Sequence, residues 1–294
     1  MPLSALALVL AAALLHALWN IVAKRAGGNH HFAFVSVLFT VVIWAPVAVA
    51  FGALNEALRW GAREWLVLAA SALVHVLYFT VLLTGYRKAD LTVVYPVARG
   101  SGPLLASVGA LAVLGEPLTL LGGVGVLAVC GGVFLIAGGP RILRAGPEAP
   151  GHAQALAGVR WGAATGLLIA AYTVIDGYAV KVLLIGPVIV DYVGNLLRVP
   201  LLAPGAWRDP AGFRAACRGQ WRPAVVIAVM GPLAYVLVLY AVQLAPLSHV
   251  APAREVSMLF AALIGGRLLG EGDRGWRIVG ACCIAAGVIA LATA

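Results

Sequence analysis

The chain has 294 residues, of which 63% are hydrophobic and only 11% are charged, and its formal net charge is +9. Soluble domains are about half apolar and about a quarter charged, so this composition excludes a soluble globular fold. The basic residues lie in short connections between apolar runs, which indicates membrane topology and argues against nucleic-acid binding.

Apolar runs between polar or Pro- and Gly-rich breaks predict an all-α polytopic membrane protein with ten transmembrane helices. A crossing needs roughly 20 apolar residues, so a chain of this length can cross about ten times. The expected helices span residues 2–23, 32–53, 65–86, 91–114, 118–138, 160–182, 186–204, 223–243, 247–269 and 275–293.

The two halves of the chain resemble each other. The aligned pairs are Arg99 with Arg254, Gly115 and Glu116 with Gly270 and Glu271, Lys24 with Lys181, and Tyr78 with Tyr235. We therefore expect one five-helix repeat in residues 1–139, a linker in 140–158 and a second repeat in 159–294. Because five is odd, the second repeat enters the membrane from the opposite side, which predicts inverted repeats of the kind that secondary transporters use.

Basic residues are distributed unequally between the two expected faces. One face carries Lys24, Arg25, Arg87, Lys88, Arg141, Arg144, Arg160, Arg208, Arg214, Arg218, Arg222, Arg267, Arg274 and Arg277, and the other carries Arg59, Arg63 and Lys181. The positive-inside rule makes the first face cytoplasmic and places both termini outside.

Charged or polar groups inside the hydrocarbon usually face a cavity or one another, because each costs at least a few kcal/mol there. Those expected at depth are His16, His75, Arg99, Asp176, His249, Arg254 and Glu255. Asp191 and Arg198 lie nearer the ends of their segment, where snorkelling to the interface explains them.

Helical spacing groups several of these residues with aromatic side chains. His16, Trp19 and Asn20 share one face of the first helix, which either lines a cavity or hydrogen-bonds across a helix interface. The repeat places Tyr78 and Tyr235 at matching depths, where each offers a ring and a hydroxyl.

The fourth, sixth and ninth helices carry charged groups near breaks in the apolar pattern. Tyr95 and Arg99 are one turn apart among prolines and glycines, and Arg254 follows Pro252. Each Arg either binds a substrate carboxylate in a bidentate manner or forms a structural ion pair with Asp176 or Glu255. Tyr172 and Asp176 are also one turn apart, and this carboxylate could receive an ammonium group, carry a proton or neutralise an Arg.

The Gly-rich fifth and tenth helices predict close-packing faces rather than a site. Their glycines are Gly122, Gly123, Gly125, Gly131, Gly132, Gly280 and Gly287. The four cysteines form no CxxC pair and have no His spaced as a zinc partner, so we expect no metal site and no disulfide.

The segment 90–105 (DLTVVYPVARGSGPLL), the following Leu-Gly-Glu-Pro-Leu at 114–118, the second Gly-Glu at 270–271 and the Trp19–Asn20 to Lys24 end of the first helix carry a family resemblance. The whole layout resembles the EamA-type members of the drug/metabolite transporter superfamily. The resemblance implies a carrier in the bacterial inner membrane that exports amino acids, including aromatic ones, or related metabolites without a cofactor. No P-loop motif for ATP occurs in the chain. The second copy departs from the first at 251–257 (APAREVS), which makes symmetric substrate binding by the halves doubtful.

We expect a central, mostly apolar cavity lined by the first, third, fourth, sixth, eighth and ninth helices, with the other four largely bland at that depth. The candidate substrate-binding residues are His16, Trp19, Asn20, Tyr78, Tyr95, Arg99, Tyr172, Asp176, Tyr235, Arg254 and Glu255. Efflux of cationic drugs or transport of another metabolite is the alternative within transport. An intramembrane enzyme would need a motif such as His-Glu-x-x-His or paired Asp, and neither occurs. The expected partners are a small-molecule substrate and the lipid bilayer.

Overall fold

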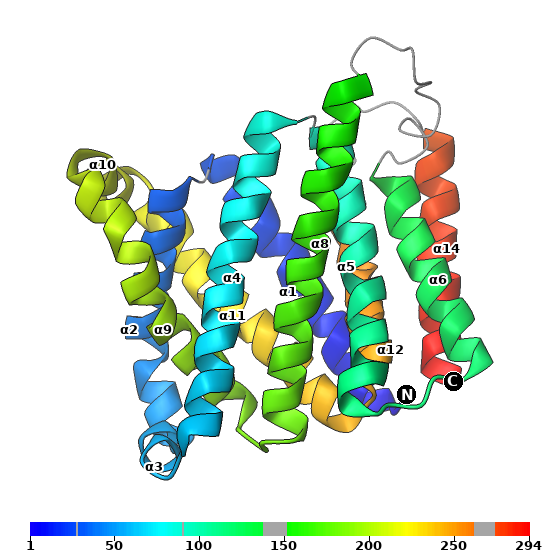
Figure 1. Cartoon of the computed structure of the whole chain (residues 1–294), viewed down its shortest axis with the longest axis horizontal. Coiled ribbons are helices and arrows are strands. Elements are labelled where there is room, and N and C mark those ends of the chain that lie inside the picture. Colours follow the sequence, from blue (N-terminus) through cyan, green and yellow to red (C-terminus); the bar gives the residue numbers. More distant parts are fainter. Residues whose placement is uncertain (28, 90, 138–151, 262–273) are drawn as a thin grey trace.

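A computed structural model describes residues 1–27, 29–89, 91–137, 152–261 and 274–294 (Figure 1), and all the regular structure in those ranges is helical. The helices are α1 (Leu3–Ala26), α2 (His30–Ala50), α3 (Ala53–Ala57), α4 (Ala62–Lys88), α5 (Leu91–Leu114), α6 (Leu120–Ile136), α8 (His152–Lys181), α9 (Pro187–Arg208), α10 (Pro210–Gly219), α11 (Trp221–Leu244), α12 (Leu247–Ala253), the 3-10 turn η1 (Arg254–Val256) and α14 (Arg274–Thr293). The chain is therefore all-α, as its composition predicts.

Seven of the described helices, namely α1, α2, α4, α5, α8, α11 and α14, are long and apolar enough to cross a membrane. α6 is apolar but shorter, with 17 residues. α9 has 22 residues but carries polar side chains that lower its hydropathy. The expected count of ten stays a prediction, because residues 262–269 of the ninth expected helix lie outside the described ranges. α8 begins at His152 rather than at 160, inside the segment expected to be a linker.

Polar side chains cap several helix ends in the connections. The Asn29 side chain accepts a hydrogen bond from the N–H of Phe32 at the start of α2, and Thr119 does the same for Gly122 at the start of α6. Gly27 ends α1 in the left-handed conformation, with φ of 63°. These caps satisfy backbone groups that the helices leave unpaired at their ends.

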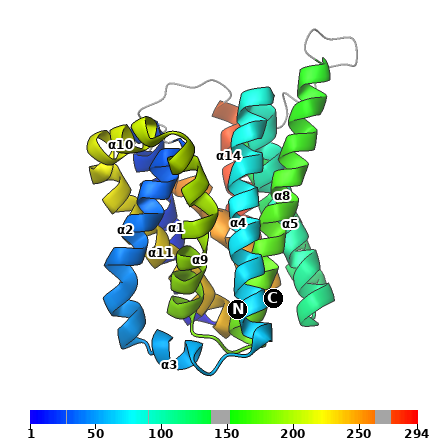
Figure 2. The same cartoon turned by 60° about the vertical axis from the view of Figure 1, so that its left-hand side comes forward.

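Packing pairs helices of the first half with helices of the second half. α4 and α5 both pack against α8, α1 packs against α11, α2 packs against α9 and α11, and α6 packs against α14. Figure 2 shows α2, α9 and α10 on one side of the molecule and α5 and α8 on the other. In Figure 1, α1 runs away from the end that carries both termini, whereas α8 runs toward it.

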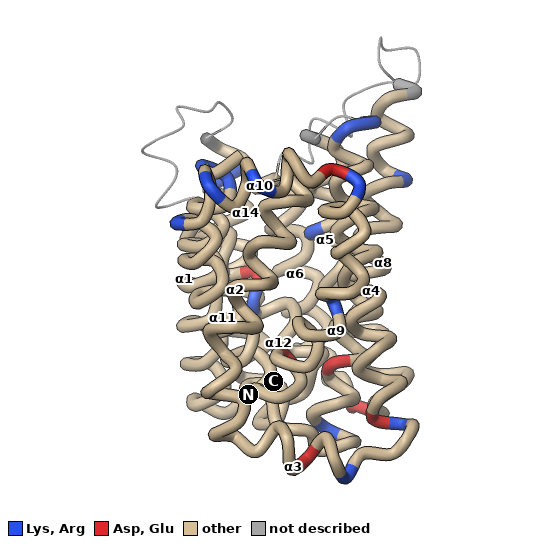
Figure 3. Tube along the Cα trace, turned by 90° about the vertical axis from the view of Figure 1, so that its left-hand side faces the viewer, with Lys and Arg blue, Asp and Glu red and all other residues tan. Residues whose placement is uncertain are grey.

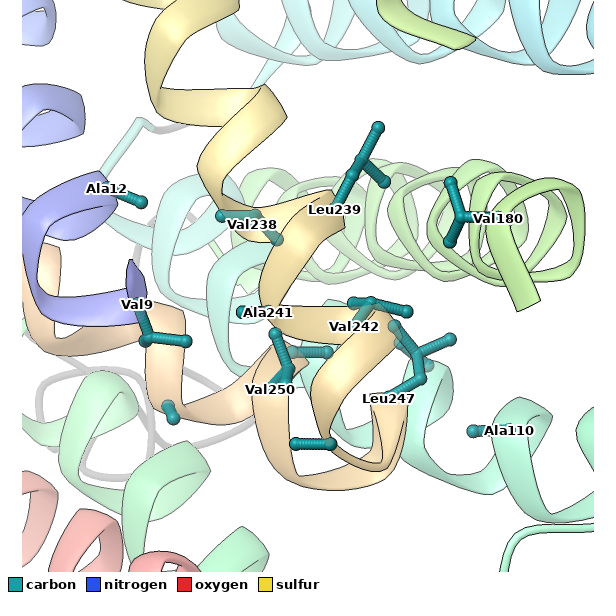
Figure 4. Close-up of a cluster of buried hydrophobic side chains, with 14 of the residues drawn as sticks. Val9, Ala12, Ala110, Val180, Val238, Leu239, Ala241, Val242, Leu247 and Val250 are labelled. Atoms are coloured by element: carbon teal, nitrogen blue, oxygen red, sulfur yellow. The ribbon is translucent and has the colours of Figure 1, made fainter. Parts of the chain in front are cut away.

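The apolar core occupies the half of the molecule that contains the two termini. Its side chains come from the first half of α1, the second halves of α5, α8 and α11, and α12, among other segments. Figure 4 shows part of it, where Val242, Leu247 and Val250 lie at the turn from α11 into α12 and Val9 lies to one side on α1. Small, branched side chains let these helices approach closely, and close packing drives helix association in lipid.

Lys and Arg gather at the opposite end of the molecule, the end that carries α10 (Figure 3). Fewer of them lie at the end with the termini. For the described residues this distribution agrees with the basic face expected from the sequence, whereas Arg141, Arg144 and Arg267 lie outside the described ranges. The assignment of that face to the cytoplasm stays a prediction.

Glycines let α6 and α14 cross at backbone contact. A Cβ added to Gly132 would lie 2.6 Å from the carbonyl oxygen of Gly280, and one added to Gly125 would lie 2.9 Å from that of Gly287. The reciprocal contacts at Gly280 and Gly287 are equally short. The expected close-packing role is therefore confirmed for these four glycines, whose contacts join the two halves of the chain. For Gly131 the expectation was wrong, because a Cβ added there meets nothing within 4 Å.

Replacing Gly132 by Val is expected to lower the free energy of unfolding by about 1–3 kcal/mol, because overpacking a close helix contact forces the backbones apart. Thermal unfolding in detergent measures the change. Gly131 is the matched control, since a Cβ there meets nothing within 4 Å. Equal melting temperatures for Gly132→Val and Gly131→Val would contradict the assignment.

Candidate functional site

A buried carboxylate lies where α4, α8 and α11 meet. Asp176 on α8 is only 1% exposed. The Ser71 hydroxyl on α4 donates a hydrogen bond of 2.5 Å to Asp176 Oδ1, and the Tyr235 hydroxyl on α11 donates to Oδ2. Both donors are neutral. The carboxylate is thus oriented by hydroxyl groups from two other helices.

Aromatic rings cover the space beside this carboxylate. The His75 ring stacks on Tyr172 with centroids 3.9 Å apart, and Tyr78 lies 5.6 Å from Tyr172. His75 Nε2 is 4.0 Å from Asp176 Oδ2. The structure therefore brings together Tyr78, Tyr172, Asp176 and Tyr235 from the predicted set, with His75 among them.

A second buried group contains two guanidinium groups and one carboxylate. Arg99 on α5 forms an ion pair of 3.0 Å with Glu255 Oε2, and Arg254 Nε lies 4.0 Å from Glu255 Oε1. Glu255 is 1% exposed and Arg254 is 8% exposed. Of the pairings expected from sequence, Arg99 with Glu255 is confirmed as a structural ion pair.

The predicted residues on α1, a helix that packs against η1, make few polar contacts with the described residues. His16 and Trp19 pack edge to face with centroids 4.9 Å apart. The Asn20 side chain donates to the carbonyl oxygen of His16 in its own helix, so this hydrogen bond does not cross a helix interface. Trp19 Nε1 is buried with no hydrogen-bond partner among the described residues. Tyr95 on α5 donates to the Met258 sulfur at 3.2 Å.

The expectation that the seventh helix is bland was wrong. Asp191, Asn195 and Arg198 form one row on α9, in which Arg198 donates to Asn195 at 3.2 Å and Asn195 donates to Asp191 at 3.1 Å. Asp191 and Asn195 are each 5% exposed, so snorkelling to the interface does not explain Asp191. Their i, i+4, i+7 spacing was the signal in the sequence, because it places all three on one helix face.

The two charged groups differ in net charge when every member is ionised. Arg99, Arg254 and Glu255 together carry a net positive charge at the α5 and η1 side. Asp176, Asp191 and Arg198 together carry a net negative charge at the α8 and α9 side, where Arg198 is close enough to attract both carboxylates. Tyr172 lies near enough to interact with Asp176's partner Tyr235 and with Arg254. The two buried groups therefore carry opposite net charge when all their members are ionised.

A separate apolar groove of about 690 Å³ lies between α4, α5 and α8. The residues that line it include Leu66 of α4, Leu105 of α5 and Tyr178 of α8, and none of the predicted site residues is among them. This groove is therefore not the expected substrate cavity. In the described parts of the chain, no three His, Cys, Asp or Glu side chains lie close enough to hold a metal ion.

Comparison with known protein families identifies the family of this protein. The model of the EamA-like transporter family matches residues 3–138 and again residues 156–293, so two copies cover nearly the whole chain. The chain belongs to the EamA-like transporter family. It is thus a multi-pass membrane protein built from two EamA repeats, and its family is one of membrane transporters of small molecules.

Solved structures support the fold of this EamA-like transporter. A crystal structure described only as that of a protein superimposes with a TM-score of 0.74 at 18% sequence identity, covering 100% of this chain and 97% of that chain. At this identity the likeness supports the fold alone. No protein of curated function matches the chain significantly.

Proposed function

We propose that this EamA-like transporter exports amino acids from the bacterial cytoplasm across the inner membrane. The observation that carries the proposal is the placement of the buried charged residues, which in their ionised forms give net positive charge beside η1 and net negative charge beside α8 and α9. A zwitterion presents a carboxylate and an ammonium group together. It complements both ends at once, whereas a simple amine or a simple acid complements only one.

Each end has chemistry suited to its proposed ligand group. Glu255 is shared between Arg99 and Arg254, and Arg254 is the more distant of the two from it. A guanidinium group such as that of Arg254, which is only weakly paired with Glu255, can form a bidentate contact with a substrate carboxylate. The Ser71 and Tyr235 hydroxyls hold the Asp176 carboxylate in a fixed orientation, in which it can accept a hydrogen bond from an ammonium group. Tyr78 and Tyr172 would contact the substrate side chain.

The architecture supports transport by alternating access. The repeated family match, the opposite directions of α1 and α8, and the exchange of packing partners between the halves are features of inverted repeats. Such halves can exchange conformations and open a central site to each side in turn. The chain contains no P-loop, so a gradient of the substrate or of protons, rather than ATP, would drive the export.

Counterflow in proteoliposomes tests the proposed substrate. Liposomes loaded with an unlabelled aromatic amino acid should accumulate the labelled form, and other amino acids should compete. The matched competitors are the decarboxylated amine and the deaminated acid of the same side chain, each of which lacks one charged group. We expect each to compete at least about tenfold less well, because hydrogen bonds to charged groups contribute about 1.5–3 kcal/mol.

The same competitors separate the alternatives. Stronger competition by the amine would assign the protein to export of organic cations, as a drug-efflux carrier. Stronger competition by the acid would assign it to another, anionic metabolite. Either result would overturn the amino-acid proposal.

A further inference from the structure

The Gly-Glu element after α5 has a role that substrate binding does not explain. Gly115 adopts the left-handed conformation with φ of 65°, which other residues rarely adopt. This turn ends α5 and directs the following Glu116 toward the second half of the chain. The Glu116 side chain is 7% exposed, so it is buried although it lies in a connection.

Four donors from two other segments converge on this carboxylate. Lys181 Nζ, at the end of α8, donates to Glu116 Oε1 at 2.6 Å, and the Leu247 N–H donates to the same oxygen at 2.7 Å. The N–H and the hydroxyl of Ser248 each donate to Oε2 at 2.9 Å. The two backbone donors belong to the first turn of α12, which has no intrahelical partner for them. Glu116 therefore ties the ends of α5 and α8 to the start of α12.

These donors also keep Glu116 ionised. Burial by itself would raise the pKa of this carboxyl, but the hydrogen bonds from Lys181 and from the Ser248 and Leu247 backbone lower it below its ordinary value of 4.5. A depressed pKa means that the contacts are fully present above the ordinary value and are lost only as the pH falls through the lower value. They therefore persist across the neutral range.

α12 connects the residues that Glu116 contacts to the candidate site. It has seven residues, all buried in the apolar core, and leads without a loop into η1, which carries Arg254 and Glu255. Leu247 of α12 packs against Gly177 of α8, and Figure 4 shows it beside Val242 of α11. Displacing the start of α12 would shift both charged residues and loosen the core at this end.

We propose that Glu116 is a positioning residue that clamps α12 to α8 and keeps the Lys181 end of the carrier closed, and that release of this clamp opens that end during transport. The inference rests on the proposed alternating access and does not depend on the substrate. The clamp consists of Glu116, Lys181, Leu247 and Ser248. In the expected topology, the end that it closes faces away from the cytoplasm.

Cysteine labelling measures the opening directly. The reporter is Leu239→Cys in a background without the four natural cysteines, because Leu239 is 2% exposed and lies in the core one turn from Tyr235. A membrane-impermeant maleimide is added from the Lys181 side of oriented proteoliposomes without substrate. Glu116→Gln turns one acceptor oxygen into an N–H donor that faces other donors. We expect about tenfold faster labelling, because charge-assisted hydrogen bonds are among the stronger ones.

Glu64→Gln is the matched control. Glu64 also caps a helix, but it is less buried than Glu116 and accepts from a single described donor, the N–H of Gly61 at 2.8 Å. Its neighbour Arg63 bonds Tyr178 near the end of α8, which places both glutamates at the same end of the molecule. Glu64→Gln should label at the parental rate. If it accelerates labelling as much as Glu116→Gln, the effect is one of general loosening and the clamp is refuted.

Two further variants keep the test decisive if Glu116→Gln does not fold. Lys181→Met and Ser248→Ala each remove part of the clamp and should accelerate labelling by smaller factors, with unchanged elution from a sizing column. Parental labelling rates in both would overturn the proposal. Because no substrate is present, a carrier of some other metabolite would still show the acceleration. Amino-acid transport with unaltered labelling would refute only the clamp.

Discussion

Replacing Asp176 by Asn is expected to lower amino-acid transport by roughly 100-fold, because the substrate ammonium group loses a charged acceptor that is only 1% exposed. The protein should remain folded. Asn is nearly isosteric and removes an ionised group from a low-dielectric environment, where an uncompensated charge is costly. Initial rates of counterflow measure transport, and thermal unfolding in detergent measures stability.

The neighbours of Asp176 supply graded controls. Ser71→Ala and Tyr235→Phe each remove one hydroxyl that orients the carboxylate, so each should lower transport by about tenfold, the effect of one such hydrogen bond. Asp209→Asn is the matched carboxylate control, because Asp209 is exposed and caps α10 outside the site. Parental transport by Asp176→Asn would remove Asp176 from the substrate site.

Replacing Glu255 by Ala is expected to lower the free energy of unfolding by about 3–5 kcal/mol, because it leaves buried positive charge without its partner. Arg99 loses an ion pair of 3.0 Å, and Arg254 loses the same carboxylate. Water cannot easily replace Glu255, which is only 1% exposed. The melting temperature in detergent should therefore fall more than for any of the site variants above.

A double variant distinguishes an unpaired charge from a lost side chain. Arg99→Met combined with Glu255→Ala should be more stable than Glu255→Ala alone, because replacing a whole ion pair is far less costly than breaking it. If Glu255→Ala destabilised the protein only by leaving a cavity, that cavity would persist in the double variant, and the melting temperature would not recover. Equal melting temperatures for the single and double variants would therefore contradict the electrostatic interpretation.

The sequence by itself determined the class, the repeats and the family of this protein. A soluble fold could not bury this much apolar surface, so membrane helices followed from composition. The paired landmarks Arg99 with Arg254 and Glu116 with Glu271 led to two related halves, and two family matches cover them. Depth in the membrane also identified Asp176, Arg99, Arg254 and Glu255, since charged groups remain there only where they face a cavity or one another.

The tertiary structure alone decided which of these residues meet. Glu255 rather than Asp176 pairs with Arg99, Asp176 accepts from Ser71 and Tyr235, and Glu116 clamps the start of α12. Helical spacing reports which residues share a face, as it did for Asp191, Asn195 and Arg198, but it does not report how each helix is rotated against its neighbours. That rotation depends on side-chain packing between segments far apart in the chain, such as the Gly132 and Gly280 contact, and packing of this kind exists only once the helices have assembled.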